Sequence, residues 1–292
     1  MADISLTSTT RSNLLSLQQT TDLANRTQGR LSTGLKVASA LDDAVAYFQS
    51  KGLTDRAADF TDRKNDIDQG ISSLKAAVNA TEAGDKILKQ LKGIAISAKT
   101  ADDTTKTDLS AQFKDLLNQL NSLFGDASFQ GTNLVNSTVQ DLTVRFSEAT
   151  TSELQINGRD LRAGALFTAA ANASDAGSVI FAALVGGSSF TAIAASQLVT
   201  TINDLASTVD SAVSTVRSAA ANLGSNITLL QTRLDFSKNY VNTLTEGSDK
   251  LRLADLNEEG ANLVALQTRQ QLALQALQFA GQNEKAVLKL FQ

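Results

Sequence analysis

Apolar residues near the start of the chain recur at steps of three and four, the spacing of a heptad repeat. The stripe consists of Leu14, Leu17, Thr21, Ala24, Gln28, Leu31 and Leu35. It predicts a helix that ends near Gly34, because glycine commonly follows the last helical turn. The end of the chain repeats the pattern with Leu263, Leu266, Gln270, Ala273, Leu277, Ala280, Glu284, Val287 and Phe291.

Longer helices are predicted between these two ends. Asp42 and Asp43 can cap a helix over residues 44–49. A separate, longer helix is expected from about residue 67 to the polar run 100–107, and a further helix over 109–124. The longest apolar stripe begins at Leu198 and continues to Leu244, which corresponds to about 48 residues and roughly 70 Å of helix.

The periodicity changes after Gly125. Apolar and polar residues alternate over 142–146 and again over 154–156, with a polar turn at 147–152. Alternation of this kind predicts a β-hairpin with one buried face, here over residues 141–157. Residues 164–196 are rich in Ala, Gly and Ser, so we expect a short excursion at the surface there.

Composition supports long helices. The 292 residues contain no proline, and only 5% are aromatic although 42% are hydrophobic. Proline breaks helix interiors, and large aromatics usually fill compact cores. The expected fold class is mainly α: an elongated antiparallel helical bundle or coiled coil with a β-hairpin, in which the N- and C-terminal helices pair.

The chain lacks two of the residue types on which catalysis most often depends. Without Cys or His, there is no thiol nucleophile, no disulfide, and neither the commonest general base nor the commonest metal ligand. We therefore expect no enzyme activity, cofactor or metal. A net charge of −4 gives no nucleic-acid signature, and without a run of about 18 apolar residues no membrane insertion is expected. The first residues lack the pattern of a secretory signal peptide.

Several short motifs have a structural explanation that is preferred to a functional one. Ser72 and Lys75 match a serine-nucleophile spacing without its companion motifs. The acidic set Asp102, Asp103 and Asp108 lacks the glycine and the final glutamate of a calcium loop. Three glycosylation-type triplets begin at residues 25, 136 and 226, and two of them fall within predicted helices.

The terminal stripes have either of two explanations, an ordinary core or a seam between subunits. No charged residue lies between Arg269 and Glu284, whereas a solvated helical face normally carries charges. Isolated helices are also marginal in water. Ends that become ordered on association favour a polymer-forming subunit.

Three segments in the correct order resemble bacterial flagellins. They are RLSTGLKV at 30–37 followed by SALDDA at 39–44, SFQGTNLV at 128–135, and the tail with QTRQQL at 267–272, QAL at 275–277 and VLKLF at 287–291. The segment at 46–48 is most similar to the alphaproteobacterial branch. The resemblance covers essentially the whole chain.

The resemblance implies a domain organisation and partners. Residues 1–36 and 251–292 would form an inner coiled-coil domain, 37–163 and 197–250 a tube domain, and 164–196 a short insertion replacing outer domains. Ser39, Asp42 and Asp43 would connect the two domains. It also implies an extracellular filament for motility, export by the flagellar type III apparatus with a chaperone, and contacts with itself and with the cap and hook-junction proteins.

Some flagellins are bound by an innate immune receptor through the segment that matches residues 88–98 here. The matching surface would comprise Leu88, Gln90, Leu91, Lys92, Gly93 and Ile94. Recognised members carry a basic residue at the position of Gln90 and a glutamate at that of Gly93, so we expect weak or absent recognition.

Two alternatives to a filament subunit remain from the sequence alone. A hook–filament junction adaptor would have similar length and terminal helices, but it would form a ring at most. An unrelated coiled-coil enzyme or regulator would be a structured monomer or small oligomer with stable termini.

Overall fold

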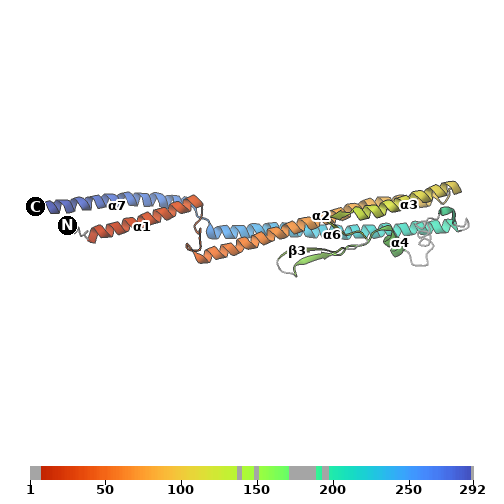
Figure 1. The fold of residues 1–292 in the computed structure, drawn as a ribbon, viewed down its shortest axis with the longest axis horizontal. Coiled ribbons are helices and arrows are strands. Elements are labelled where there is room, and N and C mark those ends of the chain that lie inside the picture. The colour runs from red at the N-terminus through yellow and green to blue at the C-terminus, as the bar shows by residue number, and fades with distance from the viewer. Residues whose placement is uncertain (1–7, 137–139, 148–150, 171–188, 193–196, 291–292) are drawn as a thin grey trace. The chain divides into compact units, whose positions relative to one another are not determined.

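The computed structural model describes residues 8–136, 140–147, 151–170, 189–192 and 197–290 (Figure 1). The chain divides into two compact units, which are treated separately. The first comprises residues 1–57 and 242–292, and the second residues 58–241. Helices make up most of both units, so the predicted mainly α class is confirmed.

In the first unit, the terminal helices pair. Helix α1 (Ser8–Thr33) lies beside helix α7 (Leu256–Leu290), as predicted (Figure 1). Gly34 ends α1 with φ +71°, a left-handed conformation that glycine adopts without strain. Beyond it, Leu35 forms an antiparallel bridge with Leu253, and the Ala254 amide donates to the Gly34 carbonyl.

Helix α2 (Ala44–Ser97) is a single helix of 54 residues. Separate helices over 44–49 and from about 67 were expected, so that prediction was wrong. The intervening stretch carries few large apolar residues and gives no clear period, yet it is helical and buries Ser50, Ala57 and Phe60. Asp43 caps the helix start as predicted, because its carboxylate accepts from the Ala46 amide at 3.0 Å.

In the second unit, helix α3 (Asp103–Asp126) is capped by Asp102. Two short strands follow, β1 (Ser128–Phe129) and β2 (Thr132–Asn133), which pair antiparallel. Gln130 and Gly131 connect them with φ values of 51° and 84°. Positive φ at both central residues is typical of a tight type I′ hairpin turn. This small hairpin was not predicted.

The predicted larger hairpin is confirmed. Strand β3 (Leu142–Arg145) pairs antiparallel with β4 (Glu153–Ile156), with Leu142 opposite Ile156 and Arg145 opposite Glu153. Val144 and Ile156 are buried, while alternate residues of both strands are exposed. One face of this hairpin therefore packs on the helices, and the opposite face is exposed to solvent.

Residues 164–196 are not simply a surface excursion. Helix α4 (Ala163–Ala170) buries Leu166 and Phe167, and the short 3₁₀ helix η1 (Phe190–Ala192) buries Phe190. For these residues the expectation was wrong. The segment is rich in Ala and Gly overall, but it contains a few large apolar side chains that pack in the core. Residues 171–188 lie outside the described part of the chain.

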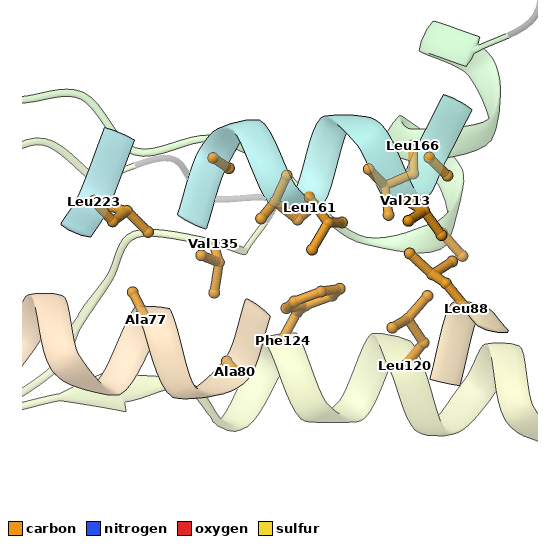
Figure 2. Close-up of a cluster of buried hydrophobic side chains, with 14 of the residues drawn as sticks. Ala77, Ala80, Leu88, Leu120, Phe124, Val135, Leu161, Leu166, Val213 and Leu223 are labelled. Atoms are coloured by element: carbon orange, nitrogen blue, oxygen red, sulfur yellow. The ribbon is translucent and has the colours of Figure 1, made fainter. Parts of the chain in front are cut away.

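The core of the second unit is built from α2, α3, α4 and helix α6 (Leu198–Arg252), the longest predicted helix (Figure 2). Its largest fully buried side chains include Phe113, Phe124, Phe167 and Phe190. Small residues on α2 make room for them. A Cβ on Gly84 would lie 2.5 Å from Phe124 Cζ, and one on Gly70 would lie 2.7 Å from Val144 Cγ2.

Candidate assembly surface on the terminal helices

The seam between α1 and α7 uses only part of the predicted N-terminal stripe. Leu17 is half-buried and Ala24 buried, but Leu14 and Leu31 remain 38% and 36% exposed. Among the α1 residues whose burial the structure describes, Thr10 and Thr27 are buried besides Ala24. The contact face on α1 therefore lies one residue away from much of the leucine stripe. Both the predicted leucine stripe and the observed contact face follow steps of three and four residues, and both include Leu17 and Ala24.

On α7 the predicted stripe does face the seam. Leu266 is buried, and Leu263, Ala273, Leu277 and Ala280 are half-buried. Leu35, just after α1, is also half-buried. The side chain of Val287 and the whole of Phe291 lie outside the described residues.

Large apolar side chains remain uncovered on both terminal helices. Leu15 and Leu23 on α1 are 57% and 51% exposed. The exposed large apolar residues on α7 are Leu256, Val264, Leu272, Leu274 and Phe279. Full burial of one such side chain contributes about 1.5–3 kcal/mol, and apolar patches of this kind mark interaction surfaces.

Polar contacts set the register of the pair. The Arg30 guanidinium contacts the Glu259 carboxylate at 2.8 Å, and Glu259 is only 7% exposed. The Gln270 amide donates to the Thr21 hydroxyl at 3.2 Å. A buried charge without a partner is strongly destabilising. A register of α1 against α7 that separated Arg30 from Glu259 would therefore be disfavoured.

The turn before α2 is organised by Asp42. Its carboxylate accepts from the Ser39 amide at 3.0 Å, the Ser39 hydroxyl at 3.2 Å and the Ala38 amide at 3.2 Å. The hydrogen bond from the Ser39 amide is the main reason that the pKa of Asp42 lies below its usual value. Arg26, at 3.8 Å, adds to this effect. The predicted residues Ser39, Asp42 and Asp43 are therefore brought together in one turn.

The segment that matches the immune-receptor surface is only partly at the surface. Leu88 and Leu91 are fully buried in the core of the second unit, which corrects their assignment to an exposed surface. Gln90 and Gly93 are exposed and Ile94 is half-buried. Lys92 pairs with Asp210 of α6 at 2.6 Å. The helix must bury one face to be held against α6, and these two leucines lie on it.

The other motifs have local structural roles. The Ser72 hydroxyl donates to the Asp68 carbonyl one turn earlier. Asp102 caps α3 by accepting from the Thr105 amide, and the hydrogen bonds from Thr105 lower the pKa of Asp102. Within the described ranges, no cluster of three or more acidic, His or Cys side chains is placed to hold a metal ion.

Among the described helices, none combines the length and hydropathy needed to cross a membrane.

A buried residue that was not predicted from the sequence, Asn133, caps the C-terminal end of α3. The Asn133 side chain donates to the carbonyls of Phe124 at 2.8 Å and Gly125 at 3.0 Å, and accepts from the Val135 amide at 2.9 Å. It satisfies helix-end carbonyls that would otherwise lack partners. The Gly131-Thr132-Asn133 sequence was the available signal, but turn residues alone do not reveal which helix they cap.

These features define a helical structural protein whose paired ends leave apolar faces uncovered. Two family models match it: the bacterial flagellin N-terminal helical region over residues 4–140 and the bacterial flagellin C-terminal helical region over residues 206–291. The chain belongs to the bacterial flagellin family. It is a structural, non-enzymatic protein, an extracellular subunit of the flagellar filament that serves motility. The filament-subunit prediction is thereby confirmed.

Relatives match over the full length. Flagellin FljO of Caulobacter vibrioides is 30% identical over 282 residues, covering 96% of this chain and 94% of that protein. The flagellin of Brucella melitensis is 26% identical over 292 residues and covers 100% of both chains. The crystal structure of Bacillus cereus flagellin aligns with a TM-score of 0.45 and 17% identity, over 59% of this chain and 88% of that one.

Proposed function

We propose that the uncovered apolar faces of α1 and α7 are the main surface through which copies of this flagellin pack in the filament. The observation that carries the proposal is the exposure of large side chains on both paired helices. Leu15 and Leu23 on α1, together with Leu272 and Phe279 on α7, are each more than half exposed. The stripe residues Leu14 and Leu31 lie on the same helix and add to this surface.

Burial of these apolar side chains favours assembly over an isolated α1–α7 pair. These four side chains are already partly covered, so burial of the part that is still exposed stabilises an assembly by about 3–7 kcal/mol before the cost of association. The charge-free stretch between Arg269 and Glu284 removes the desolvation cost that lysine or glutamate would add at a packed surface.

We further propose the domain organisation implied by the family. Residues 1–36 and 251–292 would form the inner domain, and residues 37–163 and 197–250 the surrounding tube domain. Residues 164–196 would replace the outer domains of larger members. The turn with Ser39, Asp42 and Asp43 supports a defined connection between residues 36 and 44, because its hydrogen bonds hold one conformation.

The partners other than the chain itself also remain proposals. They are the flagellar export apparatus with a secretion chaperone, the filament cap, and the hook-junction proteins. No contact with nucleic acid is proposed, because the chain carries a net charge of −4.

Seeded elongation tests the assembly surface. Purified full-length protein is added to sheared filament seeds and observed by negative-stain electron microscopy. Truncations lacking residues 1–35 or 260–292 are run beside it. A Leu23→Ser, Phe279→Ser variant tests the exposed face, and Gln271→Ser serves as a control at an exposed polar position of α7.

We expect long filaments from the full chain and from the control, and none from the truncations or the double variant. Filaments of normal length from the double variant, with terminal helices as protease-resistant as in the unchanged chain, would refute this surface.

A further inference from the structure

Asn157 is an exposed asparagine followed by a glycine, and the two residues lie directly after strand β4 in a segment without regular secondary structure. The sequence contains no other Asn-Gly pair. Among the described residues, the other exposed asparagines all lie in helices. There the main-chain amides are held in the hydrogen-bonding pattern of the helix, so Asn157 differs from them in both its neighbour and its setting.

An asparagine side chain reacts with the main-chain nitrogen of the next residue when that nitrogen is within reach. The nitrogen loses its proton to solvent and bonds to the side-chain carbonyl carbon Cγ. The bond from Cγ to the side-chain nitrogen breaks, and that nitrogen takes up a proton and leaves as ammonia, which closes a succinimide ring. Water then opens the ring at either carbonyl to give aspartate or isoaspartate. The reaction consumes water and needs no oxidant, reductant or enzyme.

The structure leaves the attacking nitrogen available. The Gly158 amide donates no hydrogen bond to any described residue, whereas the Arg159 amide beside it donates to the Leu134 carbonyl at 2.8 Å. Glycine has no Cβ to obstruct the approach of its nitrogen, and its main chain adopts conformations closed to other residues. Both properties favour ring closure at Asn157.

Two other asparagines show how the fold prevents this reaction elsewhere. Asn133 is 6% exposed, and its side-chain amide donates to the carbonyls of Phe124 and Gly125. Asn121 lies in α3, and its side-chain oxygen accepts from the Ala163 amide at 2.9 Å. A side chain held by such bonds cannot turn towards the following nitrogen. No bond of this kind to a described residue holds the side chain of Asn157.

We propose that Asn157 is a site of self-modification, at which this flagellin converts to aspartate or isoaspartate without an enzyme. The ammonia that leaves is lost to solvent, so the modified fraction of this extracellular protein rises with the age of each subunit. The inference does not depend on the assembly surface proposed above, because the reaction occurs within one chain and Asn157 belongs to the second unit.

The product places a new negative charge at the end of the larger hairpin. Leu142 pairs with Ile156 at this end of the β3–β4 ladder, and one more step in the same register brings Asp141 opposite Asn157. The Asp141 carboxylate also accepts from the Gln155 side-chain amide at 3.4 Å. Like charges directly opposite each other destabilise a strand pair, so the hairpin of a modified subunit should open more readily at this end.

Isotope labelling of the folded monomer tests the reaction. The protein is incubated in water enriched in a heavy oxygen isotope and then digested with trypsin in ordinary water. Cleavage after Arg145 and Arg159 releases peptide 146–159, in which Asn157 is the only asparagine. Ring opening takes its oxygen from water, so only modification during the incubation introduces the heavy isotope. Peptide 218–233 is the internal control, because its exposed Asn222 lies in α6.

We expect heavy oxygen to accumulate in peptide 146–159 and to stay at background in peptide 218–233. Gly158→Ala places a Cβ beside the attacking nitrogen, and should slow the labelling about tenfold, equivalent to a barrier higher by about 1.4 kcal/mol. Asn157→Gln keeps the amide but requires a larger ring, so its labelling should be close to background. Circular dichroism establishes that both variants fold.

Three results would overturn the proposal. The first is labelling of peptide 146–159 that does not exceed that of peptide 218–233. The second is Gly158→Ala labelling as fast as the unchanged chain. The third is a folded chain that labels more than about tenfold more slowly than the same chain unfolded in urea, because the fold would then protect Asn157 by more than about 1.4 kcal/mol.

Hydrogen exchange tests the consequence for the hairpin separately. Asn157→Asp supplies the charge of the product, and should speed amide exchange in the β3–β4 ladder by up to about fivefold. Adding Asp141→Asn to this variant removes the opposing charge and should restore the original rate. Exchange that Asn157→Asp leaves unchanged, or that Asp141→Asn does not restore, would overturn the predicted repulsion.

Discussion

Gly84 offers a sharp test of how the second unit is packed. A Cβ at this position of α2 would lie 2.5 Å from Phe124 Cζ and 3.2 Å from Phe124 Cε1. Contacts this short require the ring to move. Phe124 has no exposed surface, so its ring has no route into solvent, and its neighbours in the core must shift as well.

Two effects of opposite sign decide the result of Gly84→Ala. Replacing a helical glycine by alanine stabilises a helix by about 1 kcal/mol. Inserting a methyl group into a filled core costs about 1–3 kcal/mol, and contacts near 2.5 Å place this site at the upper end. We therefore expect a net loss of about 1–2 kcal/mol in the free energy of unfolding.

Gly93 on the same helix is the matched control. A Cβ there would meet nothing within 4 Å, so Gly93→Ala should raise the free energy of unfolding by up to about 1 kcal/mol. Urea unfolding of the monomers, followed by circular dichroism at 222 nm, measures both changes. The two variants should shift the midpoint in opposite directions.

A double-mutant cycle identifies the cause. Phe124→Leu shortens the side chain that meets the new methyl group, so Gly84→Ala should be less destabilising in that background, with a coupling of about 1 kcal/mol. If Gly84→Ala stabilises the protein as much as Gly93→Ala, the close packing of α2 on Phe124 is refuted.

Three further changes have defined outcomes. Asn133→Asp should lower the free energy of unfolding by about 2–4 kcal/mol, because a carboxylate would replace the amide that donates to two helix-end carbonyls. Arg30→Met should cost about 3 kcal/mol in the terminal pair, since it leaves the buried Glu259 carboxylate unpaired, and limited proteolysis should then cleave α1 and α7 faster. Asp85→Asn should destabilise the monomer at pH 7 but not near pH 2, as thermal melts across this pH range would show.

The sign of the pH effect follows from the position of Asp85. Partial burial by itself would raise the pKa of Asp85, but hydrogen bonds from Lys89 at 2.7 Å and Arg217 at 2.8 Å outweigh it and lower the pKa. A carboxyl group with a lowered folded-state pKa contributes stability above its unfolded pKa of about 4. That contribution is lost as the pH falls through the folded value.

Each of these predictions has a control and a contradicting result. Asn133→Ala removes the two donated hydrogen bonds, and also the one accepted from the Val135 amide, without adding charge. A loss for Asn133→Ala that equals or exceeds that of Asn133→Asp would therefore argue against repulsion at the carbonyls. A paired Arg30→Met, Glu259→Leu variant should recover most of the protease resistance; failure to do so would show that the ion pair is not the cause. An Asp85→Asn deficit that persists unchanged to pH 2 would contradict the ionic explanation.

The sequence by itself determined the helical class, the long α6 helix, the β3–β4 hairpin and the pairing of the two ends. These features follow from periodicity, which repeats over many residues and reports the buried face of each element directly. The end of α1 at Gly34 belongs to the same group, because a single residue with a strong conformational preference marks it. The flagellin resemblance was also available, since its motifs lie in these regular segments.

Tertiary structure decided those features for which the local sequence permits more than one conformation or more than one buried face. The spacing on α1 permits either a leucine face or a face with Thr10 and Thr27, and only the presence of α7 decides which one is buried. Likewise, residues 50–66 carry no clear apolar period, and their helix is held by the burial of Ser50, Ala57 and Phe60. Gly84, Asn133 and Phe190 acquire their roles from residues far away in the sequence. Such contacts depend on shape and on unsatisfied hydrogen-bonding groups of distant elements, which a local pattern does not contain.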